Sequence, residues 1–208
     1  MISPFLLLEL LGTAAFAASG ALTGISKKQD IFGISSLALV TAVGGGVIRD
    51  VVIGNTPPMT FRKPIYVIVA LIMAAVLFVA HRRHYFTHHD RIYKSLFFLT
   101  DTIGLGVFTI EGMRITKEFL PDATIPLMLF VGVITGVGGG VIRDIMGNST
   151  PEILYKNVYA TASVAGAIVT IICWEFFGNI IAMPAGFFTI FVIRALAVRN
   201  NWSLPKSK

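Results

Sequence analysis

Seven long apolar stretches, separated by short polar segments, make up most of the 208-residue chain. Each is close to the roughly 20 residues that a helix needs to cross the hydrocarbon core of a bilayer. The pattern predicts an all-α, polytopic membrane protein with seven transmembrane helices, which form a single transmembrane domain over residues 1–208. The predicted spans are Pro4–Thr23, Ile31–Val52, Pro64–Ala80, Ser95–Gly112, Thr124–Met146, Val158–Trp174 and Asn179–Ala197.

The composition agrees with this pattern and limits what else the chain can do. With its 20 glycines included, about 65% of the chain is apolar, against roughly 45–50% in a soluble domain. Charged residues make up only 13%, and the spans leave no room for a separate catalytic domain. The single cysteine, Cys173, excludes an intrachain disulfide and a cysteine-based metal cluster. We therefore expect no enzyme activity and no cofactor, apart from potassium or sodium ions that permeate.

The basic residues assign the two sides of the membrane. If the spans alternate, the side of the N-terminus receives four of the 17 lysines and arginines, namely Arg62, Lys63, Arg114 and Lys117. The opposite side receives eleven, and basic loops are typical of the cytoplasmic side. This predicts an outside N-terminus and a cytoplasmic C-terminus. Because the net charge of +6 is scattered, we expect contacts with membrane lipids and none with nucleic acid.

An eight-residue segment occurs twice in the chain. Val43–Asp50 and Val137–Asp144 are identical, at an offset of 94 residues. A weaker match, at an offset of 92 residues, pairs Glu9, Gly12, Phe16 and Gly20 with Asp101, Gly104, Phe108 and Gly112. Each repeat holds three spans, so consecutive repeats must enter the membrane from opposite sides. The sequence predicts two inverted repeats, a common transporter architecture, at about residues 4–80 and 95–174, with a seventh helix at about 179–197.

The repeated segments carry glycine triplets, Gly44–Gly46 and Gly138–Gly140, in the middle of predicted spans. Each glycine weakens a helix by about 1 kcal/mol relative to alanine. One hypothesis is an unwound turn that lines a pore, because irregular backbone at membrane depth requires a cavity or protein around it. Alanine at Gly45 and Gly139 would then lower permeation more than folding. The alternative is close packing of two helices through small residues.

A charged pair follows each triplet, Arg49–Asp50 and Arg143–Asp144. Adjacent residues on a helix do not face each other, and charges in a membrane need partners. The inverted repeat therefore predicts crossed pairs, Arg49 with Asp144 and Arg143 with Asp50, or one member that faces an aqueous vestibule. Interfacial snorkelling at the end of a span is the alternative. The candidate ion path consists of Thr41, Gly44, Gly45, Gly46, Arg49, Asp50, Thr135, Gly138, Gly139, Gly140, Arg143 and Asp144.

Other polar residues are secondary candidates. Glu9 and Asp101 occupy corresponding repeat positions on glycine-rich helix faces, where they either attract cations or form hydrogen bonds as neutral acids. Glu111 ranks lower because it lies near the predicted end of its span. The four histidines, His81, His84, His88 and His89, are mixed with arginines, which favours a basic loop near anionic lipid over a metal site.

The two GGGVIRD segments, Gly44–Asp50 and Gly138–Asp144, together with the following Pro57 and Pro151, resemble the trimeric intracellular cation (TRIC) channel family, in its prokaryotic branch. The resemblance covers nearly the whole chain. It implies a homotrimer in the inner membrane of a bacterium or archaeon, with an hourglass pore in each protomer. It also implies kinked second and fifth helices and passive permeation of monovalent cations, chiefly potassium.

These observations predict a potassium-permeable channel whose path runs between the two triplet-bearing helices. Some bacterial members of the TRIC family, which this chain resembles, look like importers of glycine. A secondary carrier for glycine or another small neutral solute is therefore the alternative. Both functions need broken helices at a site near the middle of the membrane. A non-conducting scaffold is a third, weaker interpretation.

Overall fold

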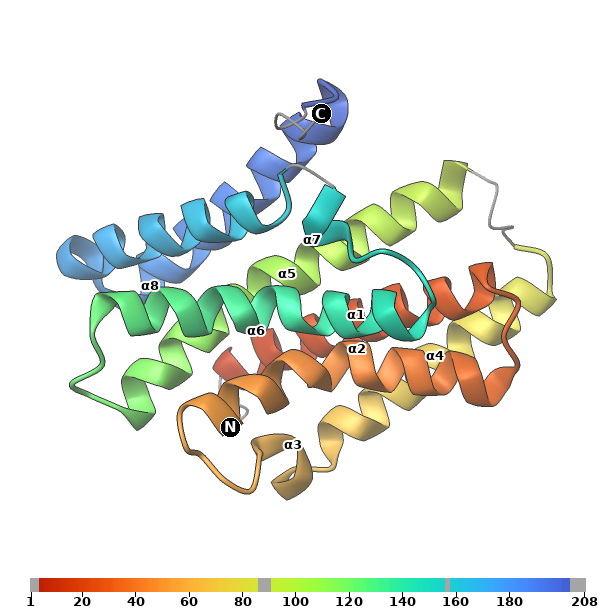
Figure 1. Ribbon diagram of the computed structural model, residues 1–208, viewed down its shortest axis with the longest axis horizontal. Coiled ribbons are helices and arrows are strands. Elements are labelled where there is room, and N and C mark those ends of the chain that lie inside the picture. Colours follow the sequence, from red (N-terminus) through yellow and green to blue (C-terminus); the bar gives the residue numbers. More distant parts are fainter. Residues whose placement is uncertain (1–3, 86–90, 156–157, 203–208) are drawn as a thin grey trace.

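The computed structural model describes residues 4–85, 91–155 and 158–202, and every regular element in these ranges is a helix (Figure 1). Six helices are long and apolar enough to cross a membrane. They are α1 (Pro4–Ser26), α2 (Ile31–Val52), α4 (Ile65–Arg82), α5 (Arg91–Phe119), α6 (Ile125–Met146) and α8 (Ala160–Arg199). Two short helices, α3 (Met59–Arg62) and α7 (Glu152–Tyr155), follow α2 and α6. The predicted all-α, polytopic membrane fold is confirmed.

Helix α8 consists of two arms. Its 40 residues would extend about 60 Å as a straight helix, twice the thickness of a hydrocarbon core. The backbone is non-helical at Gly178, where φ is 67° and ψ is −176°, a conformation that favours glycine. The chain reverses there, and the arms lie side by side (Figure 1). A Cβ on Gly166 would lie 2.7 Å from the carbonyl oxygen of Gly186, so the arms touch through small residues.

Helices α2 and α6 begin with similar caps, at Asp30 and Thr124. The Asp30 side chain accepts a hydrogen bond from the Gly33 N–H at 2.8 Å at the start of α2. The Thr124 hydroxyl accepts one from the Leu127 N–H at the start of α6. Such side chains satisfy backbone donors that have no partner within the helix.

The helices pack in two groups that have matching internal contacts. Helices α1, α2 and α4 contact one another, as do α5, α6 and α8. The groups join where α2 packs on α6 and α1 packs on α5. Helices α2 and α6 are antiparallel, because Gly44 faces Ile142 while Ile48 faces Gly138. The outer faces carry large exposed apolar side chains, such as Ile72 on α4, as a lipid-facing surface requires.

Candidate functional site

The two glycine triplets form the central contact between α2 and α6. Both helices are continuous α-helix through the triplets, so the predicted unwound turn is wrong. A Cβ on Gly45 would lie 2.1 Å from the Thr135 carbonyl oxygen, and one on Gly139 would lie 2.2 Å from the Thr41 carbonyl oxygen. The helices thus touch backbone to backbone, and the alternative of close packing accounts for the middle glycines. A path between α2 and α6 is closed at this level.

The remaining triplet glycines face different surroundings. A Cβ on Gly44 or Gly138 would contact an isoleucine of the opposite helix, whereas one on Gly46 would have the Arg49 guanidinium, at 3.8 Å, as its nearest neighbour. Gly140 leaves room for the hydroxyl of Tyr159. Only the middle glycine of each triplet is therefore required by the helix crossing itself.

The candidate threonines are also part of the packing. Thr41 and Thr135 are fully buried, and their hydroxyls donate to carbonyl oxygens one turn earlier, those of Leu37 and Val131. Thr41 lies against Gly20 of α1, and Thr135 lies against Gly112 of α5. Their hydroxyl protons are thus used within their own helices, and only the oxygen lone pairs remain for an ion.

Each signature arginine pairs with its own neighbour rather than across the repeat. Arg49 Nη2 lies 2.8 Å from Asp50 Oδ1, and the same distance separates the corresponding atoms of Arg143 and Asp144. The predicted crossed pairs are wrong because α2 and α6 are antiparallel and cross at the triplets. The two signatures therefore lie at opposite ends of the crossing, and each long guanidinium folds back onto the adjacent carboxylate.

The second oxygen of each aspartate holds a short helix. Asp50 Oδ2 accepts a hydrogen bond from the Met59 N–H of α3 at 2.7 Å. Asp144 Oδ2 accepts one from the Glu152 N–H of α7 at 2.8 Å. We refer to the two ends of the α2–α6 crossing as the Asp50 end and the Asp144 end.

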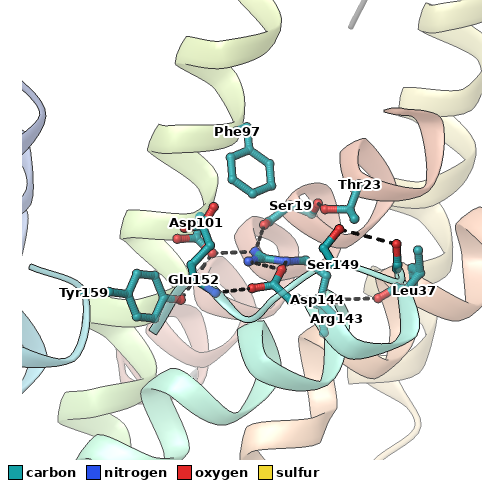
Figure 2. A network of polar contacts seen from close by, with 12 residues as sticks. Ser19, Thr23, Leu37, Phe97, Asp101, Arg143, Asp144, Ser149, Glu152 and Tyr159 are labelled. Carbon is teal, nitrogen blue, oxygen red and sulfur yellow. Dashed lines mark hydrogen bonds and ion pairs between the residues drawn. The ribbon is translucent and has the colours of Figure 1, made fainter. Parts of the chain in front are cut away.

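At the Asp144 end, a buried ion-pair network centres on Asp101 of α5 (Figure 2). Arg143 Nη1 lies 2.6 Å from Asp101 Oδ1, and Arg194 Nη1 from α8 lies 2.7 Å from Oδ2. The Tyr159 hydroxyl donates to the same carboxylate at 3.3 Å, and Ser19 of α1 accepts from Arg143. We call this set the Asp101 cluster; it joins α1, α5, α6, the second arm of α8 and Tyr159, the residue just before the first arm.

At the Asp50 end, a second network centres on Glu9 of α1. Arg114 Nη2 lies 3.0 Å from Glu9 Oε1 and 2.7 Å from Glu111 Oε2. Arg114 also pairs with Glu118, and the Tyr66 hydroxyl of α4 donates to Glu9. We call this set the Glu9 cluster. Both secondary candidates from the sequence, Glu9 and Asp101, thus face inward and pair with arginine.

The two clusters match in position but differ in charge. Glu9 and Asp101 are equivalent in the repeat, and each receives a tyrosine hydroxyl. At the repeat offset of 92 residues, Ser19 of the Asp101 cluster corresponds to Glu111 of the Glu9 cluster. Three carboxylates therefore surround one guanidinium in the Glu9 cluster, whereas Asp101 alone is held by two.

Several members of the two clusters were not predicted as site residues from the sequence, namely Ser19, Tyr66, Arg114, Tyr159 and Arg194. Arg114 was counted as an exposed loop charge, yet it lies inside α5 and is 7% exposed. Arg114 is three residues from Glu111 and four from Glu118, and side chains at these spacings are neighbours on one face of a helix. This spacing could have identified the ion pairs from the sequence. The partners of Arg194 lie too far away in sequence to give such a signal.

A cavity lies at each end of the crossing. The cavity at the Asp50 end, of about 30 Å³, is lined by Glu9, Thr13, Ala42, Val43, Gly46, Arg49, Met59, Thr60, Tyr66 and Phe108. The larger one, of about 460 Å³, touches Asp144 and Arg194. Between them, the Phe16 and Phe108 rings stack with centroids 5.3 Å apart. Cavities that include charged residues in their lining thus lie at both ends, with closely packed aromatic rings at the centre.

The histidine segment supplies no metal centre in the part of the chain that the structure describes. His81 and His84 lie at the end of α4, and His88 and His89 lie outside the described residues. Across residues 4–85, 91–155 and 158–202, no three His, Cys, Asp or Glu side chains are grouped to hold a metal ion.

Solved structures share this fold over nearly the whole chain. A structure reported for conductance through TRIC cation channels is 33% identical, has a TM-score of 0.83, and aligns over 99% of this chain and 98% of its own. The TRIC orthologue from Rhodobacter sphaeroides is 32% identical, with a TM-score of 0.85 over 95% and 98% of the two chains. The fold and the paired polar ends define a membrane protein of the TRIC channel class, and the resemblance found in the sequence is confirmed.

The family model described as Glycine transporter matches residues 6–82 and 98–175, and the chain belongs to this family. A UPF0126 membrane protein of Deinococcus radiodurans is 38% identical over 95% of this chain and 89% of its own length. A UPF0126 inner membrane protein of Escherichia coli is 36% identical over 95% and 93%. The similar solved structures are those of cation channels, which are not enzymes.

Proposed function

We propose that the protein is a potassium-permeable cation channel with a path in each protomer along the α2–α6 interface. The observation that carries the proposal is the pair of buried, carboxylate-containing clusters at the two ends of this interface. The similar structures of TRIC cation channels support it. The proposed path residues are those of the repeated signature: Thr41, Gly44, Gly45, Gly46, Arg49, Asp50, Thr135, Gly138, Gly139, Gly140, Arg143 and Asp144, with Glu9 and Asp101 beside them.

The structure represents a closed state in this proposal. Conduction requires the Phe16 and Phe108 rings to separate and the contact between Gly45 and Gly139 to loosen. Glycine lets the two backbones approach this closely, so a small separation of the helices opens space at the crossing. Once they part, carbonyl oxygens and the Thr41 and Thr135 lone pairs become available to a partly dehydrated cation.

The membrane arrangement is part of the same proposal. We propose that the two arms of α8 cross separately, which gives seven spans, and that residues 4–80 and 95–174 are inverted repeats. The antiparallel α2–α6 contact and the matching helix groups support this. The excess of basic residues supports a cytoplasmic location of the Asp144 end and the C-terminus, with the N-terminus outside. The trimeric nature of the similar channels supports a homotrimer in the inner membrane.

A secondary carrier for glycine is the second candidate. The family model that matches both halves of the chain is described as Glycine transporter. The 460 Å³ cavity presents Lys94 and Arg194 together with Asp144 and Glu152, which suit the carboxylate and the amine of a zwitterion. A closed centre with a cavity on each side is also compatible with alternating access.

Purified protein in proteoliposomes separates the two candidates. We expect a potassium gradient with a potassium-selective dye readout to show rapid flux that unlabelled glycine does not inhibit. Labelled glycine should equilibrate no faster than in empty vesicles, because a channel path selects for charge. Protein-free liposomes are the control. Saturable glycine uptake without potassium flux would favour the carrier instead.

A further inference from the structure

Arg194 is the outermost layer of the Asp101 cluster. It lines the 460 Å³ cavity, whereas Arg143 behind it is fully buried. Its guanidinium binds Asp101 Oδ2 at 2.7 Å and lies over the Tyr159 ring, with 4.5 Å to the ring centroid. Arg194 therefore separates the cavity at the Asp144 end from the buried Asp101 carboxylate.

The opposite end has a different arrangement. At the Asp50 end, Glu9 is held by Arg114, which comes from α5 within the second repeat. At the Asp144 end, one of the two arginines on Asp101 comes from the second arm of α8, which the sequence repeat does not include. The Asp144 end therefore carries an ionic contact to a segment that has no counterpart at the Asp50 end.

The second arm of α8 is suited to move. It is joined to the first arm through the non-helical Gly178, and the arms touch through Gly166 and Gly186. A largely apolar cavity of about 670 Å³ lies beside this turn, between the α1–α5 pair and Met183, Pro184 and Phe187 of the second arm. A glycine turn of this kind can act as a hinge about which a packed helix is displaced as a rigid body.

We propose that Arg194 is a latch that closes the Asp144 end, and that this end opens when the second arm of α8 withdraws Arg194 from Asp101. The proposal rests on the proposed ion path. Withdrawal leaves one arginine, Arg143, against two carboxylates, Asp101 and Asp144, so the end of the path becomes a net negative site that attracts a cation. Arg143 keeps Asp101 paired, so opening does not strand a buried charge.

The test uses cysteine accessibility, which does not depend on conduction. Ser19 is fully buried within the Asp101 cluster, so Ser19→Cys in a Cys173→Ser background reports opening of this end. We expect Arg194→Gln to raise the modification rate by a charged methanethiosulfonate reagent about tenfold. Arg194→Lys should give a smaller increase, because lysine keeps the positive charge but lacks the planar, multi-donor guanidinium. Arg199→Gln, an exposed change on the same helix, is the control.

The same variants are recorded in planar bilayers in symmetric KCl. Higher open probability for Arg194→Gln, in step with faster labelling, supports the latch. Faster labelling without potassium current in any variant also supports the latch but contradicts the channel function. Equal labelling rates for Arg194→Gln and Arg199→Gln, with both proteins monodisperse and equally heat-stable, would overturn the proposal.

Discussion

Alanine at Gly45 is expected to destabilise the protein strongly, and alanine at Gly139 should do the same. The added methyl carbon would lie 2.1 Å from the Thr135 carbonyl oxygen in the first case and 2.2 Å from that of Thr41 in the second. Both obstacles are backbone atoms, so α2 and α6 must move apart. Overpacking of this kind costs about 1–3 kcal/mol or more. The free energy of unfolding, measured in mixed detergent micelles, checks this prediction. The yield of monodisperse protein is a second readout.

Gly46→Ala is the matched control for this prediction. Gly46 lies next to Gly45 in the same helix, but a Cβ there would have only the Arg49 guanidinium within contact range, at 3.8 Å. It should leave stability unchanged or raise it by up to about 1 kcal/mol through helix propensity. Equal stability of Gly45→Ala and Gly46→Ala would show that the helices do not touch at the triplet.

Asp101→Asn should be the most damaging single change at the Asp144 end. Asp101 is fully buried between Arg143 and Arg194, so its neutralisation leaves Arg194 without its ion-pair partner and Arg143 with Asp144 alone. Removal of one member of a buried ionic cluster costs about 3–5 kcal/mol. SDS titration of the folded protein measures this loss.

The control for Asp101→Asn is Glu118→Gln. Glu118 also pairs with an arginine, but its side chain is 58% exposed, so the loss should stay below about 1 kcal/mol. Adding Arg194→Gln to Asp101→Asn should recover part of the stability, because it removes the stranded charge. If the stability loss of the double variant equals the sum of the losses of Asp101→Asn and Arg194→Gln, the two residues are not coupled.

Helix positions were predictable where the chain carries local signals. The predicted second span, Ile31–Val52, has the bounds of α2, because charged residues before this apolar run and glycine and proline after it coincide with the ends of the helix. Helix α5 was predicted as Ser95–Gly112 but runs from Arg91 to Phe119. The charges near its ends were interpreted as boundaries. The structure buries Glu111 and Arg114 inside the helix by pairing them with each other and with Glu9.

The polar sites were predictable only in part. The repeat identified Glu9 and Asp101 as equivalent and inward-facing, because both lie on glycine-rich faces. Their partners depend on tertiary packing, since Arg194 is 93 residues from Asp101 and Arg114 is 105 residues from Glu9. The crossed pairs failed because the antiparallel crossing at the triplets keeps Arg49 and Arg143 at opposite ends, and sequence symmetry does not specify the level of that crossing.

Single-channel recording of the purified protein in a planar bilayer with a KCl gradient tests the central proposal most directly. An ion path with carboxylates at both ends should give discrete current steps that reverse near the potassium equilibrium potential. Replacement of potassium by a large organic cation should abolish the steps. The absence of current, for protein that takes up labelled glycine when reconstituted in liposomes, would contradict the channel proposal. It would identify the closed centre as that of a carrier.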